Sequence, residues 1–171
     1  AIEQVNENMW QFYPTTLIES INWLPHTSLF RPINKIYNRR FANNIKTAIQ
    51  ELNFQNIILF NDNDIYNGFH LKELLQPDLY IYYMRDFLQG YDFCKRHTSV
   101  LEPELIKKAD MAVTNSTYYA EYCLGFNKNS SYIGQGCNLT LFQKEKHYPV
   151  PPEISKLKRP VIGYTGALDS T

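Results

Sequence analysis

The sequence predicts an α/β protein with a doubly wound, mostly parallel, Rossmann-like sheet and flanking helices. Short apolar runs alternate with amphipathic segments along the chain, which is typical of parallel sheets with right-handed crossovers. The runs NIILF (56–60) and LYIYYM (79–84) are continuously apolar, as expected for strands covered on both faces. Polar residues follow each run, and such folds bind ligands where strands end in loops.

The composition is that of one folded domain with no obvious charged partner. The chain has 171 residues, 17 basic and 17 acidic, for a formal net charge of +0. Nucleic acid is therefore not expected as a partner, because its binders usually carry a basic excess. The three cysteines form no CxxC pair, which favours free thiols in a reducing, cytoplasmic setting. No metal site and no resident cofactor are predicted.

In the first third of the chain we expect a strand, a loop and a long helix. The strand is Met9 to Tyr13, stopped by Pro14. Residues 15–31 are expected to form a loop with local helical pieces, either packed on the surface or acting as a lid. Apolar residues at three- and four-residue spacing predict an amphipathic helix from Ile33 to Leu52.

The strand at 56–60 leads into the cluster Asn61-Asp62-Asn63-Asp64. A metal loop is one interpretation of this cluster, but the alternating spacing, central glycine and late glutamate of an EF-hand are missing. Asx-turn chemistry is therefore favoured. A short helix at 70–75 and the strand at 79–84 follow. The exit Arg85-Asp86 then opens a predicted loop that runs to Leu101.

The stretch from Pro103 to Phe142 predicts the remaining units of the sheet. A short helix through Leu105 is followed by a strand at 111–113, a polar turn at 114–116, a helix at 118–123, a strand at 131–133 and a glycine loop at 134–136. Residues 143–160 are rich in proline and charge, which is typical of a linker. The apolar run at 161–164 is expected to be a strand.

Four segments, in this order, resemble retaining GT-B glycosyltransferases of glycosyltransferase family 4, or group 1. They are the PDL run at 77–79, the ADMAVTNS run at 109–116, the loop GQGCN at 134–138 leading to Phe142, and the PVIGYTGALD run at 160–169. The resemblance extends from Pro77 to Ser170. The loop at 134–138 departs from the family's PNGVD pattern and keeps only its central glycine, with an amide in place of the final acid.

This resemblance implies the N-terminal, acceptor-side half of a GT-B enzyme that lacks its first strands. The implied division is a domain at 1–142, a linker at 143–160 and the first strand of a truncated donor domain at 161–171. It further implies that the chain alone is inactive and that the full-length enzyme uses a nucleotide-sugar donor in polysaccharide or glycolipid synthesis. The implied partners are the missing donor domain, a saccharide or lipid-linked saccharide acceptor, and peripheral contact with the inner face of a membrane.

Candidate site residues lie at the predicted strand exits. Arg85 and Asp86 are suited to an acceptor's hydroxyl or phosphate, with a mutual salt bridge as the alternative. Asn115 or Ser116 is expected to cap the following helix. The positive end of that helix would then point toward the cleft between the two halves of the implied GT-B enzyme. The full set is Asp62, Asp64, Arg85, Asp86, Asn115, Ser116, Gly136 and Asn138. His70 and His97 are weaker candidates for a general base, with simple solvation favoured for both.

Two other kinds of function remain open from the sequence. A non-catalytic flavodoxin-like binding or regulatory module has the same alternation of strands and helices. A receiver-type module, however, needs paired acids after the first strand and a late lysine, and this constellation is missing. The third possibility is an interaction surface, formed by the apolar face that a partner domain normally covers.

Overall fold

The computed structural model describes residues 1–141 and 149–164, which belong to two compact units. The first unit is Ala1–Gly134 and the second begins at Gln135. Parts of the predicted linker and of the predicted second domain, residues 142–148 and 165–171, lie outside the described residues.

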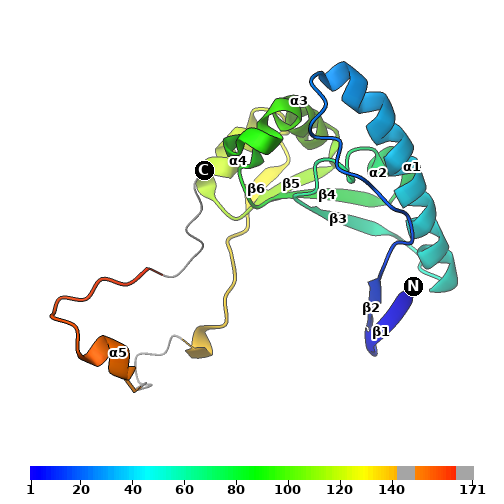
Figure 1. The fold of residues 1–171 in the computed structure, drawn as a ribbon. Helices are drawn as coiled ribbons and strands as arrows, with labels where there is room; N and C mark the ends of the chain where they lie inside the picture. Colours follow the sequence, from blue (N-terminus) through cyan, green and yellow to red (C-terminus); the bar gives the residue numbers. More distant parts are fainter. Residues whose placement is uncertain (142–148, 165–171) are drawn as a thin grey trace. The chain divides into compact units, whose positions relative to one another are not determined.

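A four-stranded parallel sheet forms the centre of the first unit (Figure 1). Its strands lie in the order β3-β4-β5-β6, with bounds Ile58–Asp62, Leu79–Met84, Met111–Thr114 and Ser130–Tyr132. The crossovers contain α2 (Leu71–Leu75), α3 (Asp92–Lys108) and α4 (Thr117–Leu124). This confirms the predicted parallel α/β architecture. The strand order runs in one direction through the described residues, so the double winding stays a prediction.

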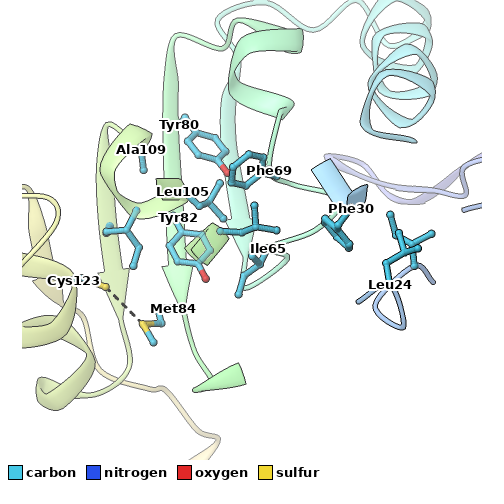
Figure 2. Packing of buried hydrophobic residues seen from close by; sticks show 14 residues of the cluster. Leu24, Phe30, Ile65, Phe69, Tyr80, Tyr82, Met84, Leu105, Ala109 and Cys123 are labelled. Carbon is cyan, nitrogen blue, oxygen red and sulfur yellow. Dashed lines mark hydrogen bonds between the residues drawn. The ribbon is translucent and has the colours of Figure 1, made fainter. Parts of the chain in front are cut away.

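One face of the sheet carries the main hydrophobic core. Tyr80, Tyr82 and Met84 alternate along β4, and all three are fully buried. Figure 2 shows them among Leu105 of α3 and Cys123 of α4, with the Cys123 and Met84 sulfur atoms 3.7 Å apart. These positions share one face because side chains alternate along a strand.

The opposite face is less covered than the sequence suggested. Ile58 and Phe60 of β3 project there and are 63% and 50% exposed. The prediction that strand 56–60 is covered on both faces is therefore wrong for the described residues. Continuous apolar character had indicated this cover, but such a run specifies only that both faces are apolar.

The first predicted strand forms a separate hairpin. β1 (Ile2–Asn6) and β2 (Met9–Phe12) pair antiparallel in a two-stranded sheet of their own. Met9–Phe12 therefore does not join the parallel sheet, and the prediction that regular alternation begins there is wrong. The ring of Trp10 lies 5.6 Å from that of Phe54, so the hairpin contacts the segment after α1.

Two helices begin earlier than predicted, and each continues through an internal proline. α1 spans Thr27–Glu51 with Pro32 inside it, and α3 spans Asp92–Lys108 with Pro103 inside it. The predicted loop from Arg85 to Leu101 is therefore a 3-10 turn, η1 (Leu88–Gly90), followed by helix. An internal proline removes one hydrogen bond to the carbonyl four residues earlier. In both helices that residue, Ser28 or Ser99, is exposed, so water can reach the carbonyl.

The second unit has little regular structure in its described part. It contains a 3-10 turn, η2 (Leu139–Leu141), and the short helix α5 (Pro152–Ser155). Residues 161–164 form no strand, which corrects the strand expected there. Ile162 is 94% exposed. An apolar run of this kind needs a neighbouring strand to complete its backbone hydrogen bonds, and the described residues supply none.

Candidate functional site

Three of the predicted site residues meet at the carboxyl ends of β3 and β4. Arg85 Nη1 lies 3.1 Å from Oδ2 of Asp62, and its Nε lies 3.2 Å from Oδ2 of Asp86. The hydrogen bond to Asp86 and the charge of Asp62 raise the pKa of Arg85. All three side chains are about half exposed, which leaves them accessible to a ligand. The salt bridge foreseen for Arg85 and Asp86 is therefore present, with Asp62 as an additional member.

The side chain of Asn63 is hydrogen-bonded to the backbone that carries this cluster. Its backbone adopts the left-handed conformation, with φ 57°, which asparagine tolerates better than most residues. Asn63 Oδ1 accepts a hydrogen bond from the Arg85 amide at 3.1 Å, and its Nδ2 donates to the Asp86 carbonyl at 3.3 Å. The buried amide thus fixes the backbone of residues 85–86, which carries the exposed charges.

Asp64 has a local structural role. Its carboxylate accepts hydrogen bonds from the backbone and side-chain amides of Asn67, at 2.9 and 3.0 Å. The backbone amide of Asp64 donates to Oδ1 of the buried Asn61, and the Asp64 carbonyl accepts from Asn61 Nδ2, each at 3.0 Å. These contacts confirm the Asx-turn interpretation of the 61–64 cluster. Asp64 is consequently committed to the turn and is not a member of the Arg85 cluster.

A hollow lies beside the same turn, between α1 and the segment 18–22. We call it the α1 hollow; its volume is about 220 Å³. Its lining combines aromatic rings with amide, hydroxyl and carboxylate groups: Ile18, Glu19, Ser20, Ile21, Asn22, Phe30, Asn34, Tyr37, Tyr66 and Asn67. About half of these residues are polar or charged, so the hollow offers hydrogen-bonding groups beside apolar and aromatic surface.

Two buried asparagines of α1 hold the wall of this hollow in place. Asn34 and Asn38 both donate to the carbonyl of Tyr66, at 3.0 and 2.9 Å. Asn38 Oδ1 also accepts from the amide of His70 at 2.8 Å. The Tyr66 hydroxyl lies 2.8 Å from that of Thr98 in α3. The segment 66–70 is thereby attached to two helices, through its backbone at Tyr66 and His70 and through the Tyr66 hydroxyl.

A buried polar network lies beneath the loop that follows β4. Glu102 of α3 is fully buried, and its carboxylate accepts from Tyr82 Oη at 2.8 Å and from Gln89 Nε2 at 2.9 Å. Gln89 Nε2 also donates to Tyr122 Oη at 2.7 Å. Burial raises the pKa of Glu102. The network joins η1, α3, α4 and β4, so it stabilises the loop that begins at Arg85.

The two histidines make their contacts with residues outside the Arg85 cluster. His97 is buried within α3, not in a loop; its Nε2 lies 3.0 Å from the Leu24 carbonyl and its Nδ1 lies 3.1 Å from Thr27 Oγ1. Since a carbonyl only accepts, Nε2 carries the proton and Nδ1 accepts from Thr27. Burial lowers the pKa of His97. His70 precedes α2, and burial likewise lowers its pKa. The prediction of a solvated loop histidine is wrong for His97.

The remaining predicted residues lie in other elements of the chain. Ser116 occupies the N-cap position of α4 but makes no side-chain capping hydrogen bond, which corrects the capping prediction for this residue. Its carbonyl instead accepts from Thr114 Oγ1 at 2.7 Å. Asn115 lies between β5 and α4. Gly136 and Asn138 belong to the second unit, where Asn138 Oδ1 accepts from the Thr140 hydroxyl at 2.6 Å.

Comparison with protein-family models, curated proteins and solved structures finds no match. The glycosyltransferase resemblance therefore stays a prediction, as do the donor, the acceptor and the enzymatic activity.

Across residues 1–141 and 149–164, no three His, Cys, Asp or Glu side chains gather in a way that suits a metal ion. Within these same ranges no helix has the length and apolar character needed to cross a membrane.

Sequence reasoning missed the α1 hollow and the Glu102 network. Both depend on α1 and α3 beginning before their internal prolines. A detectable signal was present in α3, where His97, Thr98, Leu101, Glu102, Leu105 and Ile106 recur on one helical face. Treating a proline as a necessary helix boundary concealed this pattern.

Proposed function

We propose that this chain is the acceptor-binding, N-terminal domain of a sugar-nucleotide-dependent glycosyltransferase. The observation that carries the proposal is the arrangement of polar groups after β3 and β4: the Asp62, Arg85 and Asp86 cluster, and an aromatic and amide-lined hollow beside the adjoining turn. The carboxyl ends of parallel strands are where such folds bind ligands. The ordered segments from Pro77 to Ser170 support the same class.

The chemistry of the α1 hollow suits a saccharide. A sugar presents hydroxyl groups around its ring and apolar C–H surfaces on its faces. Asn67 and Glu19 supply hydrogen-bonding groups for the hydroxyls, while Tyr37 and Tyr66 offer aromatic surface. The volume of about 220 Å³ has room for little more than one sugar ring. We assign this hollow to the terminal residue of the acceptor.

The charge at Arg85 favours a neutral acceptor group over a phosphate. One guanidinium is balanced by two carboxylates, so the cluster has a formal charge of −1. A phosphate would have to displace at least one carboxylate from Arg85. A hydroxyl, in contrast, can donate to Asp62 or Asp86 and accept from Arg85 without breaking either pair. The acceptor's hydroxyl is therefore placed here, and any lipid phosphate is placed elsewhere.

In this proposal, sugar transfer also requires a domain that binds the donor. The donor nucleotide sugar is assigned to a C-terminal domain of the same polypeptide, and the acceptor to a saccharide or lipid-linked saccharide with peripheral contact at the inner membrane face. In this scheme the present chain binds acceptor and does not transfer sugar alone.

NMR titration of the isotope-labelled chain with a panel of neutral methyl glycosides and the matching sugar phosphates tests the proposal. We expect a neutral glycoside to shift the amide signals of Asn67 and Arg85, and the phosphates to bind at least tenfold more weakly. Arg85→Ala and Asn67→Ala should each weaken binding at least tenfold, whereas the exposed control Lys46→Ala should leave it unchanged. The proposal fails if no glycoside binds and a longer chain containing the donor domain neither binds nor hydrolyses a nucleotide sugar.

A further inference from the structure

Glu102 lies at the centre of a polar network that the proposed function does not use. Its carboxylate is fully buried, and its two oxygens accept hydrogen bonds from different elements. Oε1 accepts from Tyr82 Oη of β4 at 2.8 Å, and Oε2 accepts from Gln89 Nε2 of η1 at 2.9 Å. The same nitrogen of Gln89 lies 2.7 Å from Tyr122 Oη of α4. Gln89 therefore connects a carboxylate inside the fold to a half-buried hydroxyl on α4.

Neutral groups surround this carboxylate. The titratable groups that interact with it are three tyrosines and one cysteine: Tyr66, Tyr82 of β4, and Tyr122 and Cys123 of α4. Burial raises the pKa of all four, so they carry no charge at ordinary pH. Among the described residues, Glu102 bonds to no Lys, Arg or His side chain. Its charge is therefore held by hydrogen bonds alone, and burial favours the protonated carboxyl.

The hydrogen bonds of the network fit an ionised Glu102. An ionised carboxylate only accepts, and each of its oxygens has a donor. The amide nitrogen of Gln89 carries two hydrogens, one for Glu102 and one for Tyr122. The Tyr122 oxygen therefore accepts, and its own hydrogen is left for solvent, which the half-buried side chain permits.

A proton on Glu102 is incompatible with this pattern. If the proton binds Oε1, the Tyr82 hydroxyl loses the only acceptor that it has among the described residues. If it binds Oε2, the new O–H faces the Gln89 nitrogen, which carries hydrogens and does not accept. Turning the Gln89 amide over removes the conflict, because its oxygen then accepts from both Glu102 and Tyr122. Since Gln89 is half-buried, the displaced nitrogen can bond to water.

We propose that Glu102, Gln89 and Tyr122 form a proton-driven switch. A proton from solvent binds Oε2 of Glu102, the Gln89 amide turns over, and the Tyr122 hydroxyl changes from acceptor to donor. The O–H of Glu102 is the one covalent bond formed, and the reverse steps return the proton to solvent. Gln89 belongs to the loop that begins at Arg85, so the switch couples a buried carboxyl to this loop and to α4. This role is independent of the proposed glycosyltransferase activity.

NMR of the isotope-labelled chain over a range of pH tests the switch. The Glu102 carboxyl carbon reports protonation, and the side-chain amide of Gln89 reports the turn, because its hydrogens are bonded before the turn and face solvent after it. We expect hydrogen exchange of this amide, relative to that of the exposed Gln11, to be at least tenfold faster when Glu102 is protonated. The Tyr122 Cζ signal should move with the Glu102 midpoint, whereas that of the exposed Tyr118 should not.

Two variants separate the switch from a static network. Glu102→Gln does not ionise, so the ratio of Gln89 to Gln11 exchange should become constant with pH. Tyr122→Phe removes the hydroxyl but keeps the other two members, so the ratio should still change.

Three results would overturn the proposal. They are a constant exchange ratio while Glu102 titrates, a ratio that still changes in Glu102→Gln, and a Glu102 that keeps one protonation state throughout the pH range in which the chain is folded. The first and third are measured on the native sequence, so they decide the matter even if Glu102→Gln does not fold.

Discussion

The hydroxyl of Tyr82 donates a 2.8 Å hydrogen bond to the carboxylate of Glu102, and both residues are fully buried. The bond joins the central strand β4 to helix α3. A buried carboxylate is costly unless its oxygens are hydrogen-bonded, and here Tyr82 and Gln89 each satisfy one oxygen. The pair therefore fixes how α3 lies on the sheet. The protonation of Glu102 is linked to folding, because this carboxyl is buried only in the folded state.

Replacing Glu102 with Gln should alter the pH dependence of stability. Burial raises the pKa of Glu102 above its usual 4.5, so the folded state holds the proton more tightly than the unfolded state. The contribution of this proton to the free energy of unfolding is fully present below pH 4.5, and it is lost as the pH rises through the raised pKa. Urea unfolding at several pH values should show a fall in the free energy of unfolding for the native sequence that is missing in Glu102→Gln. Parallel pH profiles would contradict this.

Removing the Tyr82 hydroxyl should destabilise the protein. Tyr82→Phe leaves one carboxylate oxygen of Glu102 without its donor, and an unsatisfied buried group costs about 1–3 kcal/mol. The free energy of unfolding in urea measures this loss. The exposed Tyr118→Phe serves as the matched control and should be close to neutral. In the double variant with Glu102→Gln, the two losses should not add, because the side chains interact directly.

His97 should give the opposite pH response. Burial lowers the pKa of this histidine below its usual 6.5, so the unfolded state takes up a proton more readily. The contribution of the neutral His97 to the free energy of unfolding is fully present above pH 6.5, and it is lost as the pH falls through the lowered pKa. His97→Gln removes the titration, and the difference in unfolding free energy between this variant and the native sequence should change below pH 6.5. A constant difference would show that His97 does not titrate in this way.

Gly68 and Gly136 should respond differently to alanine. A Cβ at Gly68 would lie 2.2 Å from Asn61 Nδ2 and 2.4 Å from the Asp64 carbonyl oxygen. Overpacking of this kind costs about 1–3 kcal/mol, and it would also disturb the turn beside the α1 hollow. A Cβ at Gly136 meets nothing within 4 Å, so Gly136→Ala is the matched control. Thermal unfolding should separate the two variants, and equal midpoints would show that the turn adapts without cost.

The sequence by itself determined the parallel α/β class and the position of β4. A continuous apolar run predicts a strand, and the turn-forming residues that follow it mark where the strand ends, because both signals lie in the local sequence. The same reasoning placed Asp62, Arg85 and Asp86 at strand ends, and the structure brings these three together.

Only the tertiary structure decided what local signals leave open. Pro32 and Pro103 suggested helix boundaries, but packing of Phe30 and Leu101 into the core outweighs the one hydrogen bond that each proline removes. The hairpin at Met9 and the uncovered face at Phe60 likewise depend on which distant segments are neighbours. A strand's own residues specify that it is apolar and extended, whereas its pairing partner is set by contacts across the whole fold.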